Sequence, residues 1–230
     1  MKYKFLKEII KKKDTKKNFS VITNIKNGQM EIYEPKGKIS KDFERYLKKI
    51  EKFFIQKKTG IIDHTDLFVE TFLQPPKVII IGAVHISEYL IEFLKNFKFE
   101  VIVIDPRSHF SLQKKFLKTK IINKWPEEAF KEIETDTSSA LITLTHDTKI
   151  DDPALKYALK NKFSYIGALG SKKTHTKRCE RLINDGFTKD QIKTIYGPVG
   201  LKIGGKSSSE IALSIISQLI QVSNEKIFTQ

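Results

Sequence analysis

The sequence predicts an α/β protein: a Rossmann-like parallel sheet with helices on both faces, plus a small N-terminal α+β unit. Residues 78–81 form a continuous apolar, β-branched run that Gly82 ends, which is typical of a parallel strand buried on both faces. A helical stripe of apolar residues follows, and a second β-branched run, 101–104, ends at Asp105. Residues 77–105 are therefore predicted to form a βαβ unit. Its acid lies about 20 residues past the glycine turn, where dinucleotide-binding folds place the carboxylate that binds a ribose.

The composition excludes several classes of protein. The chain has 230 residues and a formal net charge of +15, but its only arginines are Arg45, Arg107, Arg178 and Arg181. Arginine is the residue that contacts bases bidentately, so a lysine excess spread among acids does not predict a nucleic-acid surface. The single cysteine, Cys179, excludes a disulfide framework and a thiolate-cluster metal site. No apolar run approaches the roughly 20 residues of a membrane span, and no signal-peptide core is present, so a soluble, cytoplasmic protein is expected.

The first 74 residues are expected to form the small α+β unit, domain 1–74. In chain order it comprises a basic helix over 1–17, a hairpin of strands 19–25 and 29–33, a helix from Ser40 to about Lys57, and a strand over 67–73. No catalytic constellation is evident in this unit. Pro75 and Pro76 then separate it from the Rossmann-like domain, 75–230.

The Rossmann-like domain is predicted to continue with buried strands and capped helices. The further strands are expected over 120–123, 139–144 and 163–166. The further helices are expected over 126–133, over 154–160 with Asp152 as N-cap and Pro153 in the first turn, and after Ser171, Thr188 and Ser207. Capping boxes are expected for the last two. Residues 197–205 are too glycine-rich for a regular element and are expected to form a shaped loop.

Polar residues follow the predicted strands at the carboxyl edge of the sheet, where such folds bind ligands. They are Gly82 and His85 after the first strand, Asp105 and Arg107 after the second, and Thr145, His146 and Asp147 after strand 139–144. An arginine just past the acid can take a ligand phosphate. His146 could act as a general base, donate a hydrogen bond to a ligand or be a simple loop histidine, and spacing does not separate these roles.

Residues 167–175 are predicted to form an anion-binding loop. Gly167 and Gly170 permit close approach to the backbone, and Ser171, Lys173 and His175 add polar groups at a helix N-terminus. The spacing is not that of a P-loop. The alternative is a strand-to-helix turn with incidental lysines. Cys179, further along the same helix, is interpreted as a packing residue.

Seven segments in this order resemble the xanthine dehydrogenase accessory protein family (XdhC/CoxI), over roughly residues 66–222. The segments are 68–70, 81–85, 105–107, 145–147, 151–155, 165–175 and 197–204. The resemblance is to the family's C-terminal Rossmann-like domain, with a shortened N-terminal region. The chain departs from the family at Val84, where the family usually has glycine, and in residues 1–65, which lack the family's glycine-rich, cysteine-containing stretch.

The resemblance implies a molybdenum-cofactor chaperone, a binding protein with no catalytic residues of its own. Such a protein holds a molybdopterin-type cofactor, as such or in its cytidine dinucleotide form, while sulfur is installed, and assists insertion into xanthine dehydrogenase or a related molybdenum hydroxylase. A cysteine desulfurase and a second copy of the chain are further candidate partners. The implied cofactor-binding residues are Gly82, His85, Asp105, Arg107, Thr145, His146, Asp147, Gly167, Gly170, Ser171, Lys173 and His175, and no metal ligand is assigned.

Two alternatives use the same sheet. One is an NAD(P)-dependent oxidoreductase with His146 as proton donor, and the other is a regulatory subunit that senses a nucleotide. Residues 82–87 keep the first glycine of G-x-G-x-x-G and replace the second and third. Val84 stands where the second glycine normally lets a pyrophosphate approach the backbone, which disfavours NAD(P) as the cofactor.

Overall fold

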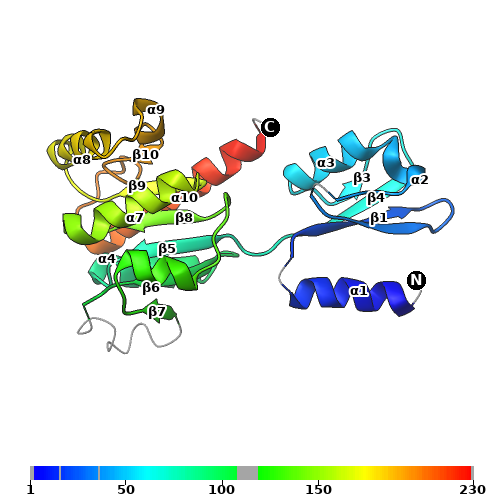
Figure 1. The fold of residues 1–230 in the computed structure, drawn as a ribbon, viewed down its shortest axis with the longest axis horizontal. Coiled ribbons are helices and arrows are strands. Elements are labelled where there is room, and N and C mark those ends of the chain that lie inside the picture. The colour runs from blue at the N-terminus through cyan, green and yellow to red at the C-terminus, as the bar shows by residue number, and fades with distance from the viewer. Residues whose placement is uncertain (1–2, 16, 36, 108–118, 229–230) are drawn as a thin grey trace. The chain divides into compact units, whose positions relative to one another are not determined.

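The computed structural model describes residues 3–15, 17–35, 37–107 and 119–228 (Figure 1). Contacts divide the chain into two compact units, one of the residues up to Gln74 with those from Glu225 on, the other of Pro75–Asn224. Residues 1, 2 and 16 of the predicted first helix lie outside the described residues. None of the described helices is long and apolar enough to cross a membrane.

The first unit is an antiparallel sheet with a helix layer on each face. Its strands are ordered β2-β1-β4-β3. Their bounds are β1 Phe19–Asn24, β2 Met30–Tyr33, β3 Gly60–Ile61 and β4 Leu67–Phe72. Helix α1 (Tyr3–Asp14) packs Ile9 against Phe19 and Val21 on one face of β1. On the other face, α2 (Lys41–Glu44) and α3 (Leu47–Ile55) pack against Ile22.

The predicted hairpin is present, but the predicted single helix over 40–57 is wrong. The chain turns over residues 25–28 between β1 and β2, where the amide of Asn24 donates to the carbonyl of Gln29 at 2.8 Å and Gly28 ends the loop with a positive φ of 73°. The helix is interrupted at Arg45 and Tyr46. Ser40 precedes α2 as its N-cap residue, but its hydroxyl donates to Glu31 instead of capping the helix. The short strand β3 was not predicted, because two residues carry no periodic pattern.

The second unit confirms the predicted Rossmann-like parallel sheet. Its strands are β5 Lys77–Ile81, β6 Glu100–Ile104, β7 Lys120–Ile122, β8 Ala140–Thr143, β9 Tyr165–Ala168 and β10 Ile195–Tyr196. Their order is β10-β9-β8-β5-β6-β7, and every neighbouring pair is parallel. The chain adds strands on one side of β5, then returns and adds them on the other. The switch point, where such sheets bind ligands, is therefore between β5 and β8.

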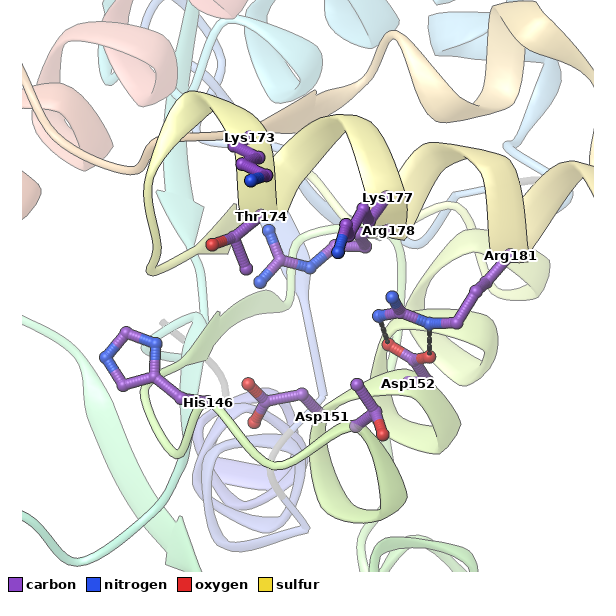
Figure 2. A pocket seen from close by; sticks show the side chains of 9 residues that line it. His146, Asp151, Asp152, Lys173, Thr174, Lys177, Arg178 and Arg181 are labelled. Atoms are coloured by element: carbon purple, nitrogen blue, oxygen red, sulfur yellow. Dashed lines mark hydrogen bonds and ion pairs between the residues drawn. The ribbon is translucent and has the colours of Figure 1, made fainter.

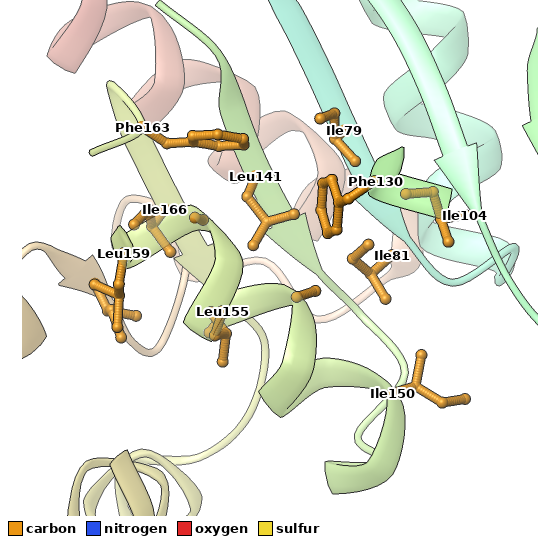
Figure 3. Close-up of a cluster of buried hydrophobic side chains, with 14 of the residues drawn as sticks. Ile79, Ile81, Ile104, Phe130, Leu141, Ile150, Leu155, Leu159, Phe163 and Ile166 are labelled. Carbon is orange, nitrogen blue, oxygen red and sulfur yellow. The ribbon is translucent and has the colours of Figure 1, made fainter. Parts of the chain in front are cut away.

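Helices cover both faces of this sheet, as predicted. One face packs against α6 (Pro126–Ala129), α7 (Thr148–Lys160), α8 (Lys172–Asn184) and α9 (Lys189–Ile192), and Figure 3 shows part of this core. The other face packs against α4 (His85–Leu94) and α10 (Ser208–Phe228). Ile79 and Ile81 point into the first core and Val78 and Ile80 into the second, all with no exposed surface. A strand buried on both faces explains the uninterrupted apolar run.

Two predicted helices differ from the structure. Helix α7 begins at Thr148, six residues before the predicted Ala154, because the side chain of Asp147 accepts a hydrogen bond from the amide of Lys149 at 2.9 Å and caps the helix. Pro153 lies inside this helix, and Asp152 is not its N-cap. The predicted helix 126–133 is α6 followed by a single 3₁₀ turn, Phe130–Glu132. The capping boxes of α9 and α10 are confirmed.

Candidate functional site

A pocket of about 260 Å³ lies between the N-terminal parts of α7 and α8, at the carboxyl edge of the parallel sheet (Figure 2). It is lined by His146, Thr148, Asp151, Asp152, Lys173, Thr174, Lys177, Arg178 and Arg181. The α7 side supplies acids and hydroxyls, and the α8 side supplies the basic groups. The site is thus built from the segments that follow β8 and β9.

The loop between β8 and α7 holds the acidic wall in place. His146 adopts a left-handed backbone with φ of 60°, which turns the chain into the helix. The Thr145 hydroxyl accepts from the amide of Asp147 at 3.1 Å and donates to Oδ1 of Asp151 at 2.7 Å. Thr145 therefore fixes both the loop and the carboxyl group of Asp151.

Helix α8 presents its basic side chains to the pocket as one stripe. Ser171 is the N-cap, and its hydroxyl accepts from the amide of Thr174 at 3.1 Å. Thr174, Arg178 and Arg181 then follow at the three- and four-residue spacing that places side chains on one helix face. The pocket thus combines positive side chains with a helix N-terminus, which also favours an anion.

Asp151 is a buried carboxyl group with an unused oxygen. The residue is 2% exposed, and Oδ2 has no hydrogen-bond partner among the described residues. Burial raises the pKa of Asp151 to about 6, while the hydrogen bonds from Thr145 and the nearby charges of Arg178 and His146 act in the opposite direction. An unpaired carboxylate oxygen in a pocket wall is costly for the fold and suits a ligand that donates a hydrogen bond.

Arg178 is the corresponding buried donor. It is 2% exposed, its Nη2 donates to the carbonyl of Leu169 at 2.8 Å, and its Nη1 lies 3.4 Å from Nδ1 of His175. Its Nε has no partner among the described residues. Burial lowers the pKa of Arg178, and Asp151 and Asp152 oppose that shift. Figure 2 shows the guanidinium group on the opposite side of the pocket from the carboxyl group of Asp151, and the described structure has no ion pair between them.

The remaining charges leave the pocket cationic. Arg181 binds Asp152 bidentately, with Nε–Oδ2 and Nη2–Oδ1 distances of 2.6 and 3.0 Å, so this pair neutralises itself. Lys173 and Lys177 line the pocket, and among the described residues neither forms an ion pair. Two lysines and Arg178 thus face one ionisable acid, Asp151, and favour an anionic ligand.

The turn after β5 is closed by the chain itself. Gly82 has a φ of 107°, and a Cβ there would lie 2.7 Å from Cγ2 of Thr145. Asp105 has no exposed surface, and its two oxygens accept hydrogen bonds from the amides of Ala83 and Arg107 and from the guanidinium group of Arg107, at 2.8 to 2.9 Å. Burial alone would raise the pKa of Asp105, but these hydrogen bonds outweigh it and hold the pKa below its usual value. Asp105 therefore ties Arg107 to the turn.

The predicted site residues do not all meet at one point. His146 and Lys173 line the pocket, while Thr145, Asp147, Gly170 and Ser171 shape its walls as loop and cap residues. Gly82, Asp105 and Arg107 form the closed turn after β5.

Three further predicted residues lie elsewhere. Gly167 is inside β9, where a Cβ would lie 2.5 Å from Cγ2 of Val199. His175 packs on Gly197, and burial lowers its pKa. His85 begins α4 with a side chain that is 82% exposed, 3.5 Å from Glu88.

Sequence reasoning missed most of the pocket lining. The missed residues are Thr148, Asp151, Asp152, Lys177, Arg178 and Arg181, whereas Thr174 lies within the predicted loop 167–175. The helical spacing of the basic residues in 174–181 was a usable signal, because it places them on the face next to the anion-binding loop. Asp151 lies in segment 151–155 of the family resemblance, but its position facing the pocket could not be predicted while the helix was taken to begin at Ala154.

The described residues contain no cluster of three or more histidine, cysteine or acidic side chains able to hold a metal ion. Cys179 lies with Sγ 3.5 Å from Nε2 of His175. Burial raises the pKa of its thiol, which makes it a poor nucleophile. The geometry of the described residues thus fits binding of an anionic, hydrogen-bonding ligand, with neither a metal centre nor an activated thiol.

Comparisons with known proteins agree with this architecture. The family model described as the XdhC Rossmann domain matches residues 78–219. A probable xanthine dehydrogenase subunit from Bacillus subtilis (strain 168) is 30% identical over 158 residues, which are 68% of this chain and 46% of that protein. The molybdenum cofactor insertion chaperone PaoD of Escherichia coli (strain K12) is 35% identical over 102 residues, 44% of this chain and 31% of that protein.

Similarity to a solved structure is evidence for the fold only. The crystal structure of a xanthine dehydrogenase from Bacillus halodurans matches with a TM-score of 0.71 and 22% sequence identity, covering 96% of this chain and 64% of that one. The chain spans less than half the length of the two curated relatives, 46% and 31%.

Proposed function

Because the chain belongs to the XdhC family, we propose that it binds the molybdenum cofactor as an accessory protein, a chaperone. It holds the cofactor while sulfur is installed and assists its insertion into xanthine dehydrogenase or a related molybdenum hydroxylase. It performs no turnover of its own, so its residues bind and shield the cargo.

The observation that carries the proposal is the cationic pocket between α7 and α8. The cofactor bears a phosphate, or a pyrophosphate in its dinucleotide form. Lys173, Lys177 and the N-terminus of α8 offer that group positive charge and amide donors. The buried, partly unpaired Asp151 and Arg178 offer polar contacts to the rest of the molecule. The residues present therefore fit the organic part of the cofactor, and we assign no protein ligand to its molybdenum.

The proposed partner is the molybdenum hydroxylase that receives the cofactor. A cysteine desulfurase as sulfur source, a homodimer, a cytoplasmic location and the cytidine dinucleotide form all stay predictions from the sequence. Of the implied cofactor-binding residues, we keep His146 and Lys173 as candidates for direct contact. We propose Thr145, Asp147 and Ser171 as positioning residues.

The alternative, an NAD(P)-dependent oxidoreductase or a nucleotide-sensing regulatory protein, is not favoured. The acid that would bind the ribose, Asp105, is fully buried and its oxygens are taken up by Arg107 and the Ala83 amide. Calorimetric titration with NADH and NADPH tests it directly, and submillimolar binding would restore the oxidoreductase interpretation.

The experiment that tests the proposal is purification from a molybdenum-replete host that makes the cofactor. After oxidation, pterin fluorescence and mass spectrometry identify what the protein carries. We expect pterin with the unmodified chain and its loss from a Lys173→Ala/Lys177→Ala variant. Lys160→Ala, an exposed lysine at the far end of α7, is the matched control and should keep it. An unmodified protein that carries no pterin contradicts the proposal.

A further inference from the structure

We infer that Asp151 and Arg178 read the hydrogen-bonding edge of an amino-oxo-pyrimidine ring, the ring system of a pterin, while Lys173 and Lys177 hold the anionic end of the same ligand. This inference rests on the proposed function and deepens it, because it assigns the two ends of the cargo to different walls of the pocket. It concerns the pocket between α7 and α8 in Figure 2.

The first step is that both residues are buried, incompletely paired and held in place. Each is 2% exposed, and each keeps one atom, Oδ2 of Asp151 and Nε of Arg178, without a partner among the described residues. The Thr145 hydroxyl fixes the carboxyl group at 2.7 Å, and the Leu169 carbonyl fixes the guanidinium group at 2.8 Å. The pocket therefore presents a fixed acceptor and a fixed donor that do not satisfy each other.

The second step is what such a pair selects. A fully ionised phosphate group offers only acceptors, so it suits Arg178 and is repelled by the carboxylate of Asp151. At pH 7.5 that carboxyl group is ionised, because its pKa is about 6. The carboxylate can accept two hydrogen bonds from a ligand, because Oδ2 is unpaired and Oδ1 keeps a second lone pair beside its bond from Thr145. A ligand that satisfies both groups must therefore present two adjacent N–H donors beside a carbonyl acceptor. An amino-oxo-pyrimidine ring carries N–H groups and a carbonyl on one edge, and it occurs in pterins and in guanine.

The third step is the separation of charge along the pocket. Lys173 and Lys177 are exposed, whereas Asp151 and Arg178 are buried. If the ring enters the pocket first, its edge exchanges hydrogen bonds to water for hydrogen bonds to Asp151 and Arg178. A phosphate attached to the ring would then remain near the exposed lysines and the start of α8. Burying a polar ring edge is favourable only where its partners are already in place, which is the situation here.

The test compares two ligands that differ in one group. Pterin (2-amino-4-oxopteridine) carries the amino donor, and lumazine (2,4-dioxopteridine) replaces it with a carbonyl acceptor. Titrations followed by ligand fluorescence at pH 7.5 use the full chain, its Asp151→Asn variant and the Lys160→Ala control. Asparagine keeps the size of the side chain and can still accept from Thr145, but it turns its amide donor toward the pocket.

We expect the unmodified chain to bind pterin about 10- to 100-fold more tightly than lumazine, the range for a hydrogen bond to a charged group. Asp151→Asn should abolish or invert this preference, and Lys160→Ala should preserve it. Binding of inorganic pyrophosphate should persist in Asp151→Asn, which also shows that the variant is folded. A preference that survives Asp151→Asn, or equal binding of both ligands by the unmodified chain, overturns the inference.

Two further comparisons complete the test. One distinguishes a pterin from a guanine ligand, and the other distinguishes failure of this inference from failure of the proposed function. Guanosine, which like pterin lacks a phosphate, shares the ring edge, and tighter binding of it than of pterin overturns the assignment to a pterin. A chain that carries the cofactor from its host but does not distinguish pterin from lumazine refutes this inference and leaves the proposed function intact. A chain that makes the distinction but never carries the cofactor refutes the proposed function and supports the reading of the ring edge by Asp151.

Discussion

Asp151→Asn is expected to make the protein more stable at neutral pH. The pKa of Asp151 rises from 3.8 to about 6 on folding, chiefly because the carboxyl group is buried. Each pKa unit corresponds to about 1.4 kcal/mol, so the ionised carboxylate destabilises the fold by about 3 kcal/mol. The folded state binds the proton more tightly than the unfolded chain. Stability is therefore lost as the pH rises from about 4 to about 6, and the loss is constant above that.

Asparagine carries no charge and can keep the hydrogen bond from Thr145, so it removes this cost without leaving a cavity. The variant should match the unmodified protein near pH 4 and exceed it by about 3 kcal/mol in free energy of unfolding at pH 8. Urea denaturation at several pH values measures the difference, since the other titrating groups are common to both proteins. Asp190→Asn, at a carboxyl group whose side chain is 91% exposed, is the control and should change little.

A difference between the two proteins that does not vary between pH 4 and pH 8 would refute the reasoning. The same result would leave the buried, unpaired Oδ2 as the remaining reason for regarding Asp151 as a binding group. A carboxylate that destabilises its own fold is informative because surface and core positions seldom retain one without a functional role.

Further predictions concern the segments that shape the pocket, each measured by urea denaturation. Gly82→Ala should cost about 1–3 kcal/mol, because its Cβ would lie 2.7 Å from Thr145. Gly186→Ala, with a φ of 90° and nothing within 4 Å, should cost about 1 kcal/mol from backbone strain alone, and equal losses would contradict the clash. Asp147→Ala should cost about 1 kcal/mol through the lost N-cap of α7, and no loss would mean that the cap is replaced. Ile142→Ala, at a site with no exposed surface, should cost about 2–5 kcal/mol, and a loss below about 1 kcal/mol would contradict tight packing around β8.

In the structure, the glycine turn that binds the cofactor in an ordinary dinucleotide fold is occupied by contacts within the chain. In this chain Gly82 makes room for Thr145 of the neighbouring loop, and the Ala83 amide binds Asp105. The turn after β5 therefore contacts the segments that follow β6 and β8 at the switch point. The open pocket lies one strand further, between α7 and α8.

The sequence by itself determined the elements whose pattern is local. The buried β-branched runs 78–81 and 101–104 predicted β5 and β6, because a strand covered on both faces needs apolar residues at every position. The hairpin at Gly28 and the capping box of Thr188 depend on residues at most a few positions apart. The seven segments that resemble one family also predicted the family. Their sequences and their order along the chain can be recognised without knowing which residues are in contact.

The tertiary structure decided which of these residues share a site. Asp105 was predicted to meet a ligand, but Arg107 and the Ala83 amide take its oxygens, and these contacts form only when β5 and β6 pair. Asp151 and Arg178 come from α7 and α8, and their burial depends on how both helices pack on the sheet. Burial of a polar atom without a partner is a property of the packed molecule. No spacing in the sequence records it, and it is the feature that defines this pocket.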